Sequence, residues 1–310
     1  MTIVGVDLGG TKTAAAIVEP DGSVRYLAQI ATPGADGAEA VLDAVAGLVR
    51  DVATTSGGEP VAVGVASAGT IDPASGVVLA ATDAIASWAG TAVASGLSAR
   101  LGVPVAVEND VAAHARGEAL HGAARGQSCA LMIAVGTGVG GAVLLDGEPL
   151  RGAQGAAGAI GHLPTPGAEG MRCGCGGTGH LEAIASGPAL YRLYLALGGD
   201  HSVIGSRAVV ERAMRGEALA ASAVRMSARA LGVAVAGLVA VVDPGIVVIG
   251  GGLAEAGELW WQELESAARA GLVAPARDIR IVPAALGATA AIVGAAHRVS
   301  ALVASPTAVA

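Results

Sequence analysis

Short apolar runs alternate along this chain with longer segments in which apolar residues recur every three to four positions. Runs rich in Val, Ile and Ala at 2–7, 12–18 and 24–30 are separated by glycine-containing turns and predict an antiparallel meander of three strands. Residues 38–52 carry apolar side chains at helical spacing and predict a helix. The chain therefore begins with strands followed by a helix.

The rest of the chain continues this alternation of short apolar runs and segments with helical apolar spacing. Further strands are predicted at 61–67, at 103–110, on both sides of the glycine turn 136–141, and at 244–252. Further helices are predicted at 91–102, 182–197, 206–215, 217–242 and from about 253. This alternation predicts a mixed α/β fold.

One segment pattern occurs twice. VDLGGTKTAAAIVEPDGSV begins at Val6, and AVGTGVGGAVLLDGEPL begins at Ala134. Each contains an apolar strand, a Gly/Thr turn, a second apolar strand and an Asp-Gly turn, which suggests a duplicated fold with a Gly/Thr hairpin in each half. Chance similarity in a Gly- and Ala-rich chain is the alternative.

Composition narrows the class of protein. The 310 residues include 71 Ala, 48 Gly, three Cys and no Phe, and the net charge is -8. The 53% hydrophobic content excludes disorder, the three cysteines exclude a disulfide scaffold, and the negative charge argues against nucleic-acid binding. The uncharged stretch 126–145 is long enough for a membrane span, but its central glycine turn favours two short strands. With no signal-peptide pattern at the start, we expect a soluble cytoplasmic protein without membrane partners.

Three glycine segments could bind phosphate or nucleotide. In DLGGTKT (7–13), glycines let backbone N–H groups approach a phosphate, and Asp7 could hold a metal ion or its water. An ordinary β-hairpin explains this segment equally well. GTGVGG (136–141) is followed by a strand, so it indicates a second phosphate hairpin and not a dinucleotide motif, which needs a helix there. Gly250–Gly252 follow a strand and could support an adenosine.

Two polar clusters could carry other chemistry. VEND (107–110) ends a strand, where a carboxylate could accept a proton from a substrate hydroxyl, although a helix cap at Asn109 or Asp110 is favoured from spacing alone. His162, Cys173, Cys175 and His180 fall within 19 residues of a glycine-rich loop, a set suited to a tetrahedral structural zinc ion. A loop with incidental Cys and His is the alternative. Glu182 would project from this loop.

Taken together and in order, these motifs resemble the ROK family of sugar kinases and repressors. The matching segments are DLGGTKT, VENDVAAHARGE, GTGVGGAVLLDGEPLRGAQGAAGAIGH, CGCGGTGHLE and DPGIVVIGGG. The resemblance implies the two-domain actin-like ATPase (ribonuclease H-like) α/β fold with a small structural zinc loop. We place the smaller domain at 1–112 plus about 290–310, and the larger at 113–289 with the zinc loop at 162–182. The resemblance also implies a homodimer.

The resemblance further implies transfer of the γ-phosphoryl of ATP, with Mg²⁺, to a hexose hydroxyl, usually at C6. Asp110 then matches the catalytic base. The residues expected to bind nucleotide and Mg²⁺ are Asp7, Gly9, Gly10, Thr11, Lys12, Gly136, Thr137, Gly138, Gly250, Gly251 and Gly252. The residues expected to bind sugar are Gly69, Asp83, Asn109, Asp110, His162 and Glu182, and the structural Zn²⁺ ligands are His162, Cys173, Cys175 and His180.

The sequence departs from the family at the sugar. The family has Glu-x-Gly-His where this chain has Ala159-Ile160-Gly161-His162, so one sugar-binding carboxylate is missing. Asp83 could instead face an amino group, which suits an amino-hexose such as kanosamine or a hexosamine beside glucose. The alternatives to a kinase are a catalytically altered ROK sugar-binding protein and a ROK regulator. The regulator is disfavoured, because the chain is acidic and starts at the first phosphate strand.

Overall fold

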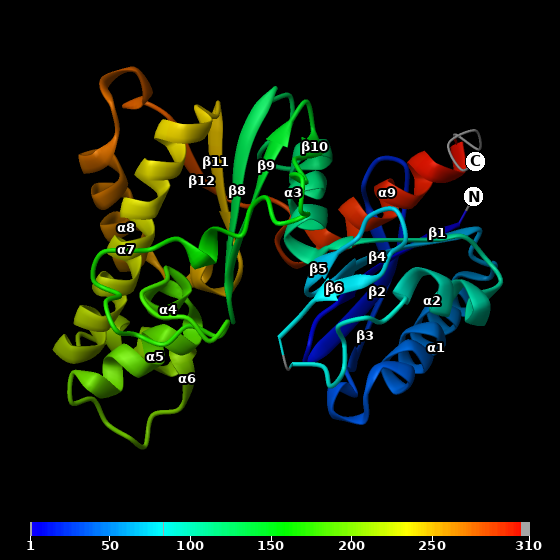
Figure 1. The fold of residues 1–310 in the computed structure, drawn as a ribbon, viewed down its shortest axis with the longest axis horizontal. Coiled ribbons are helices and arrows are strands. Elements are labelled where there is room, and N and C mark those ends of the chain that lie inside the picture. The colour runs from blue at the N-terminus through cyan, green and yellow to red at the C-terminus, as the bar shows by residue number, and fades with distance from the viewer. Residues whose placement is uncertain (1, 83, 305–310) are drawn as a thin grey trace. The chain divides into compact units, whose positions relative to one another are not determined.

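The computed structural model describes residues 2–82 and 84–304, which form two compact units (Figure 1). Unit 1 consists of the described residues of Met1–Gly126, Gly147–Ala157 and Ala285–Ala310. Unit 2 consists of Gln127–Asp146 and Gly158–Ala284. The chain therefore crosses between the units four times. The sequence-based domain boundaries at 112/113 and 289/290 differ from this division, because the helix at 110–121 packs on the last helix of unit 1.

Unit 1 is built on a five-stranded sheet of order β3-β2-β1-β4-β7. Its strands are β1 (Ile3–Leu8), β2 (Lys12–Val18), β3 (Val24–Ala31), β4 (Ala62–Ser67) and β7 (Val105–Asn109). The first three form the predicted antiparallel meander, while β1, β4 and β7 run parallel. Asp7 pairs with Ala66, and Ser67 pairs with Asn109, so the carboxyl ends of three parallel strands meet at one edge.

Helices pack on this sheet and complete unit 1. The α-helices are α1 (Ala38–Ser56), α2 (Val93–Leu101), α3 (Asp110–His121) and α9 (Ala290–Ala304), with the short 3-10 helices η1 (Gly34–Asp36) and η5 (Gly287–Thr289). The short strands β5 (Thr70–Ile71) and β6 (Val78–Ala80) pair with each other, and β10 (Glu148–Pro149) lies in the 147–157 segment. Helix α1 packs on β2 and β3, and α9 packs on β1, β4 and α3.

Helix α9 lies unusually close to the strands beneath it. A Cβ atom at Gly5 or Gly64 would collide with the backbone carbonyl oxygen of Ile292 or Ala295. Glycine at these two strand positions therefore permits the contact. The face of α9 that makes it is formed of Ala, Ile and Val side chains that are almost fully buried.

Unit 2 repeats the strand arrangement of unit 1. Strands β9, β8, β11 and β12 lie in that order in one sheet, with β8 antiparallel to β9 and parallel to β11. Their bounds are β8 (Cys129–Val135), β9 (Val139–Leu145), β11 (Ile246–Gly250) and β12 (Arg280–Pro283). In unit 1, β1 likewise pairs antiparallel with β2 and parallel with β4. The repeated sequence pattern thus corresponds to a repeated structure.

The helices of unit 2 form a large apolar core with the sheet, centred on the buried side chains of Trp260, Tyr194 and Leu231. They are α4 (Glu182–Ala185), α5 (Gly187–Ala196), α6 (Gly205–Met214), α7 (Ala218–Val242) and α8 (Glu258–Gly271), with the 3-10 helices η2 (Ile160–His162), η3 (Gly252–Glu255) and η4 (Ala274–Ala276).

The predicted helix 182–197 is instead two helices. The break falls at Ser186, whose side chain caps α5 by accepting a hydrogen bond from the Ala189 N–H at 3.3 Å. Gly187 and Pro188 follow, a sequence that favours a new helix start over continuation. The predicted helix at about 253 is the short η3, and α8 begins only after the Gly257 turn.

Two helical segments are long and apolar enough to cross a membrane by length and composition alone, Ala218–Val242 and Gly287–Ala304. Their most apolar windows are 50% and 44% buried within the structure.

Candidate functional site

Asp110 lies at the carboxyl edge of the unit 1 sheet, where β7 passes directly into α3. The side-chain oxygen of Asn109 accepts hydrogen bonds from the N–H groups of Val111 and Ala112, at 3.0 and 3.1 Å, and so caps α3. The predicted helix cap is confirmed. The Asn109 amide donates to the carbonyl of Gly69 and to the carboxylate of Asp110, both at 2.9 Å. Asn109 therefore orients Asp110, and Gly69 orients Asn109.

Asp110 and Asp7 form a pair of half-buried acids. Burial raises the pKa of Asp110, although hydrogen bonds from the Val111 N–H and Asn109 partly counter this. Burial also raises the pKa of Asp7 to about 6, the charge of Asp110 raises it further, and Lys12 lowers it. Two carboxylates that resist ionising together form a setting in which a divalent cation would be favourable.

The first glycine segment forms the tight turn between β1 and β2. The N–H of Gly9 donates to the carbonyl of Lys12 at 3.1 Å, which closes the turn. The Thr11 and Lys12 side chains are exposed. Asp7 ends up next to this turn because it precedes the last residue of β1. The structure thus brings Asp7, the turn, Gly69, Asn109 and Asp110 to one edge of unit 1.

The other two glycine segments lie side by side in unit 2. The turn between β8 and β9 is closed by a hydrogen bond from Gly136 N–H to the Gly138 carbonyl at 2.8 Å, and Thr137 is exposed. Gly251 follows β11 with φ +86° and approaches the backbone of Val135, the last residue of β8. Segments 136–138 and 250–252 are therefore adjacent, an arrangement that could bind one elongated anionic ligand.

The four predicted metal ligands also come together in unit 2. The ligand atoms of His162, Cys173, Cys175 and His180 all lie within 4.8 Å of one another. Cys173 Sγ is 3.7 Å from His162 Nδ1, and Cys175 Sγ is 3.3 Å from His180 Nδ1. Tetrahedral zinc, with bonds of about 2.0–2.3 Å, places its ligand atoms about 3.3–3.8 Å apart. These residues fit a structural Zn²⁺, which would crosslink the loop.

Local structure already brings these ligands together. His162 ends η2, and backbone bridges between Pro164 and His180 and between Arg172 and Thr178 fold the loop on itself. Burial raises the pKa of the Cys173 thiol to about 11 in the metal-free chain. A bound cation would therefore displace a thiol proton, and binding would strengthen with pH.

We expect Cys173→Ser to abolish zinc binding, because four protein ligands are needed to close the site. Zinc content, measured by metal analysis after dialysis against a weak chelator, should fall from about one equivalent to below about 0.2. Cys129→Ser is the matched control, since Cys129 lies in β8 outside the cluster. Equal zinc content in wild type and Cys173→Ser would disprove the assignment.

Glu182 joins the cysteine–histidine cluster to the second glycine turn. One carboxylate oxygen accepts a hydrogen bond from the Val139 N–H at 3.1 Å, and the other lies 3.5 Å from Cys173 Sγ. The same carboxylate lies against Gly138, where a Cβ would be 2.7 Å from it. Of the remaining predicted residues, Asp83 lies outside the described residues, and Ala159 is exposed directly before η2.

Sequence reasoning missed the roles of four charged residues, two in α3 and two that pair with it. Arg116 is 2% exposed and pairs with the buried Glu108 and with Glu148. Glu118 is fully buried. A buried charge without a partner is costly, so buried charged side chains need partners. The charged residues within the segment that matches the family motif were therefore a signal that such partners exist.

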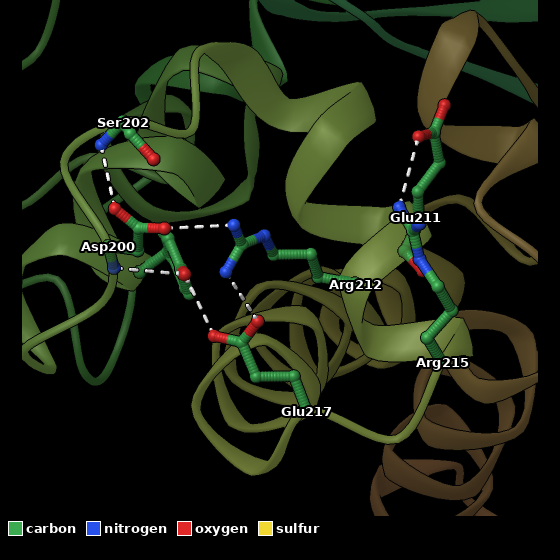
Figure 2. Close-up of polar contacts among 7 residues, drawn as sticks. Asp200, Ser202, Glu211, Arg212, Arg215 and Glu217 are labelled. Carbon is green, nitrogen blue, oxygen red and sulfur yellow. Dashed lines mark hydrogen bonds and ion pairs between the residues drawn. The ribbon is translucent and has the colours of Figure 1, made fainter.

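A second polar cluster lies on unit 2 (Figure 2). The Tyr194 hydroxyl donates to Glu217 at 2.8 Å and accepts from the Asp200 N–H at 3.0 Å. Arg212 donates to both Asp200 and Glu217. The groups hydrogen-bond to one another, so this cluster fixes the loop between α5 and α6.

Comparisons with known proteins agree with the geometry. The family model described as "ROK family" matches residues 3–301. The chain is 34% identical to a glucokinase of Streptomyces coelicolor over 94% of this chain and 96% of that protein. It is 36% identical to an N-acetylmannosamine kinase of Shigella flexneri over 82% of this chain and 85% of that protein.

Solved structures show the same likeness. A ROK family glucokinase of Streptomyces griseus, in complex with glucose and AMPPNP, matches with a TM-score of 0.84 and 32% identity over 96% of this chain and 98% of that one. The fold is accordingly the predicted α/β fold of the actin-like ATPase class. The chain belongs to the ROK family.

Proposed function

We propose that this protein is an ATP-dependent hexose kinase that uses Asp110 as its catalytic base. The observation that carries the proposal is the half-buried Asp110 carboxylate, held by Asn109 beside Asp7 and the first glycine turn. The kinase relatives support the reaction type. Phosphoryl transfer needs these parts: a base for the attacking hydroxyl, donors for the phosphates and a divalent cation.

In this proposal each group has a defined task. Asp110 accepts the proton of the sugar hydroxyl, and the burial that raises its pKa makes it a stronger base. Backbone N–H groups of the three glycine segments bind the nucleotide. Mg²⁺, held at Asp7, would neutralise phosphate charge. Asn109 fixes the orientation of Asp110, while His162 and Glu182 are proposed to contact the sugar.

The substrate class is a hexose or an amino-hexose, and Ala159 bears on the choice. A Glu at this position would supply a charged hydrogen bond to a sugar hydroxyl, and Ala159 is exposed with room for a longer side chain. We expect Ala159→Glu to raise kcat/KM for glucose about tenfold or more, the effect of one charge-assisted hydrogen bond. Steady-state kinetics with glucose test this, and Ala159→Gln serves as the uncharged control. An unchanged or lower glucose kcat/KM for the Glu variant would contradict it.

The function itself is tested by coupled ADP release with a panel of glucose, other hexoses and hexosamines. Sugar-dependent ADP formation supports a kinase, whereas sugar binding without turnover supports the catalytically altered alternative. A preference for amino-hexoses that disappears in Asp83→Ala would assign Asp83 to substrate binding.

We further propose a cytoplasmic homodimer that binds neither nucleic acid nor membranes. Light scattering coupled to gel filtration tests the oligomeric state.

A further inference from the structure

The fully buried Glu118, near the end of α3, binds three backbone N–H groups. One oxygen accepts from Ala123 at 2.7 Å and from Ala285 at 3.0 Å, and the other accepts from Leu286 at 2.8 Å. Hydrogen bonds to a carboxylate are roughly twice as strong as neutral ones. Losing these donors would leave a buried charge without hydrogen-bond partners. The carboxylate therefore holds residues 123 and 285–286 firmly against α3.

The three donors lie where the chain crosses between the units. Ala285 and Leu286 are the first two residues of unit 1 after the crossing from Ala284, and Ala123 is three residues before the crossing at Gly126. One carboxylate therefore fixes two of the four crossings inside unit 1. Gly122 leaves it the space to do so, because a Cβ at Gly122 would collide with the Glu118 carboxylate.

Glu118, which anchors these crossings, lies in the same helix as Asp110. Asp110 is the first residue of that helix, α3. Because the carboxylate ties both crossing segments to α3, a displacement of these segments would be passed to the helix that begins at Asp110.

We propose that Glu118 is a positioning residue that anchors the segments at 123–126 and 285–286 to α3 and so holds Asp110, at the start of that helix, in position. This inference rests on the proposed kinase function. Glu118 does not contact substrate in this role. Loosening the helix that carries both Asn109's cap and Asp110 should affect kcat and KM together, whereas loss of the catalytic base should affect kcat alone.

The first test is Glu118→Gln, which keeps the size of the side chain but puts an NH2 group against at least one N–H donor. Hydrogen exchange in the segments 123–126 and 285–289 should accelerate at least tenfold. In the folded variant, kcat should fall at least tenfold, and the KM values for sugar and ATP should each rise at least threefold. Glu148→Gln is the matched control, since Glu148 also binds α3, through Arg116, but is 64% exposed. It should stay within twofold of wild type.

A second variant guards against misfolding. Gly122→Ala keeps the Glu118 charge but displaces the carboxylate, and it should give the same exchange and kinetic changes in milder form. Urea unfolding midpoints monitor the folded fraction of each variant. A purely structural role predicts a lower midpoint with unchanged kcat and KM, and that result would overturn the proposal. Unchanged exchange in both variants would overturn the anchor itself. If wild type phosphorylates no sugar in the panel, the kinase function and the positioning of its base both fail, and exchange alone decides the anchor.

Discussion

Asp110→Asn is expected to lower kcat by about 10³-fold, within the range of roughly 10²–10⁴ that general bases contribute, while the Kd for sugar changes less than about threefold. The amide keeps the shape of the side chain and can still accept from the Val111 N–H, so the α3 start should persist. It cannot take a proton from the sugar hydroxyl. Only the transition state loses an interaction.

Single-turnover kinetics and calorimetric titration with the preferred sugar measure the two quantities separately. Asp21→Asn is a suitable control, since Asp21 is an exposed turn residue that binds the Ser23 N–H. Near-normal turnover of Asp110→Asn would exclude Asp110 as the base. A large rise in sugar Kd would make Asp110 mainly a binding residue.

Asp7→Asn is expected to stabilise the metal-free protein at neutral pH while lowering kcat by about 10²-fold or more. The pKa of Asp7 is raised from 3.8 to about 6 by burial and by Asp110. The folded state thus favours protonated Asp7, and ionisation costs stability as the pH rises from about 4 through about 6. At pH 7.5 that cost is about 3 kcal/mol, since one pKa unit corresponds to about 1.4 kcal/mol. Asn avoids it.

The direction of the stability difference between wild type and Asp7→Asn can be checked by urea unfolding with EDTA at two pH values. At pH 4 wild type and Asp7→Asn should be nearly equally stable, and at pH 7.5 the variant should be more stable. Added Mg²⁺ with nucleotide should raise the stability of wild type more than that of the variant. A variant less stable than wild type at pH 7.5 would refute the argument. Such a residue trades stability for function.

Local sequence was sufficient for much of the fold. The meander, the hairpin around 136–141 and the ligand loop 162–180 are each encoded within a few dozen residues, and all three form as predicted. The cap at Asn109 was also readable from spacing. The helix break at Ser186 was missed because apolar periodicity continues across it.

Long-range contacts could not be predicted this way. Two of the N–H donors to Glu118 lie 167 and 168 residues further along the chain. Arg116 meets Glu148 across 32 residues. Spacing describes one segment at a time, so it cannot show which distant backbone groups a buried carboxylate will meet. The family resemblance predicts a catalytic role for Asp110, but the sequence does not show what supports the helix that begins there.

The close packing of α9 on β1 and β4 has a consequence for biosynthesis. The sheet face that α9 covers is made early, but α9 itself is translated after residues 127–284 of unit 2. At roughly 5–20 residues per second, this delay is about 8–30 s. During that time the face around Gly5 and Gly64 lacks its covering helix, and unit 2 is itself completed only when β12 (Arg280–Pro283) has been made, just before α9. We therefore expect unit 1 to stay incomplete until α9 has been made, and its uncovered sheet face is the nascent surface that chaperones would protect.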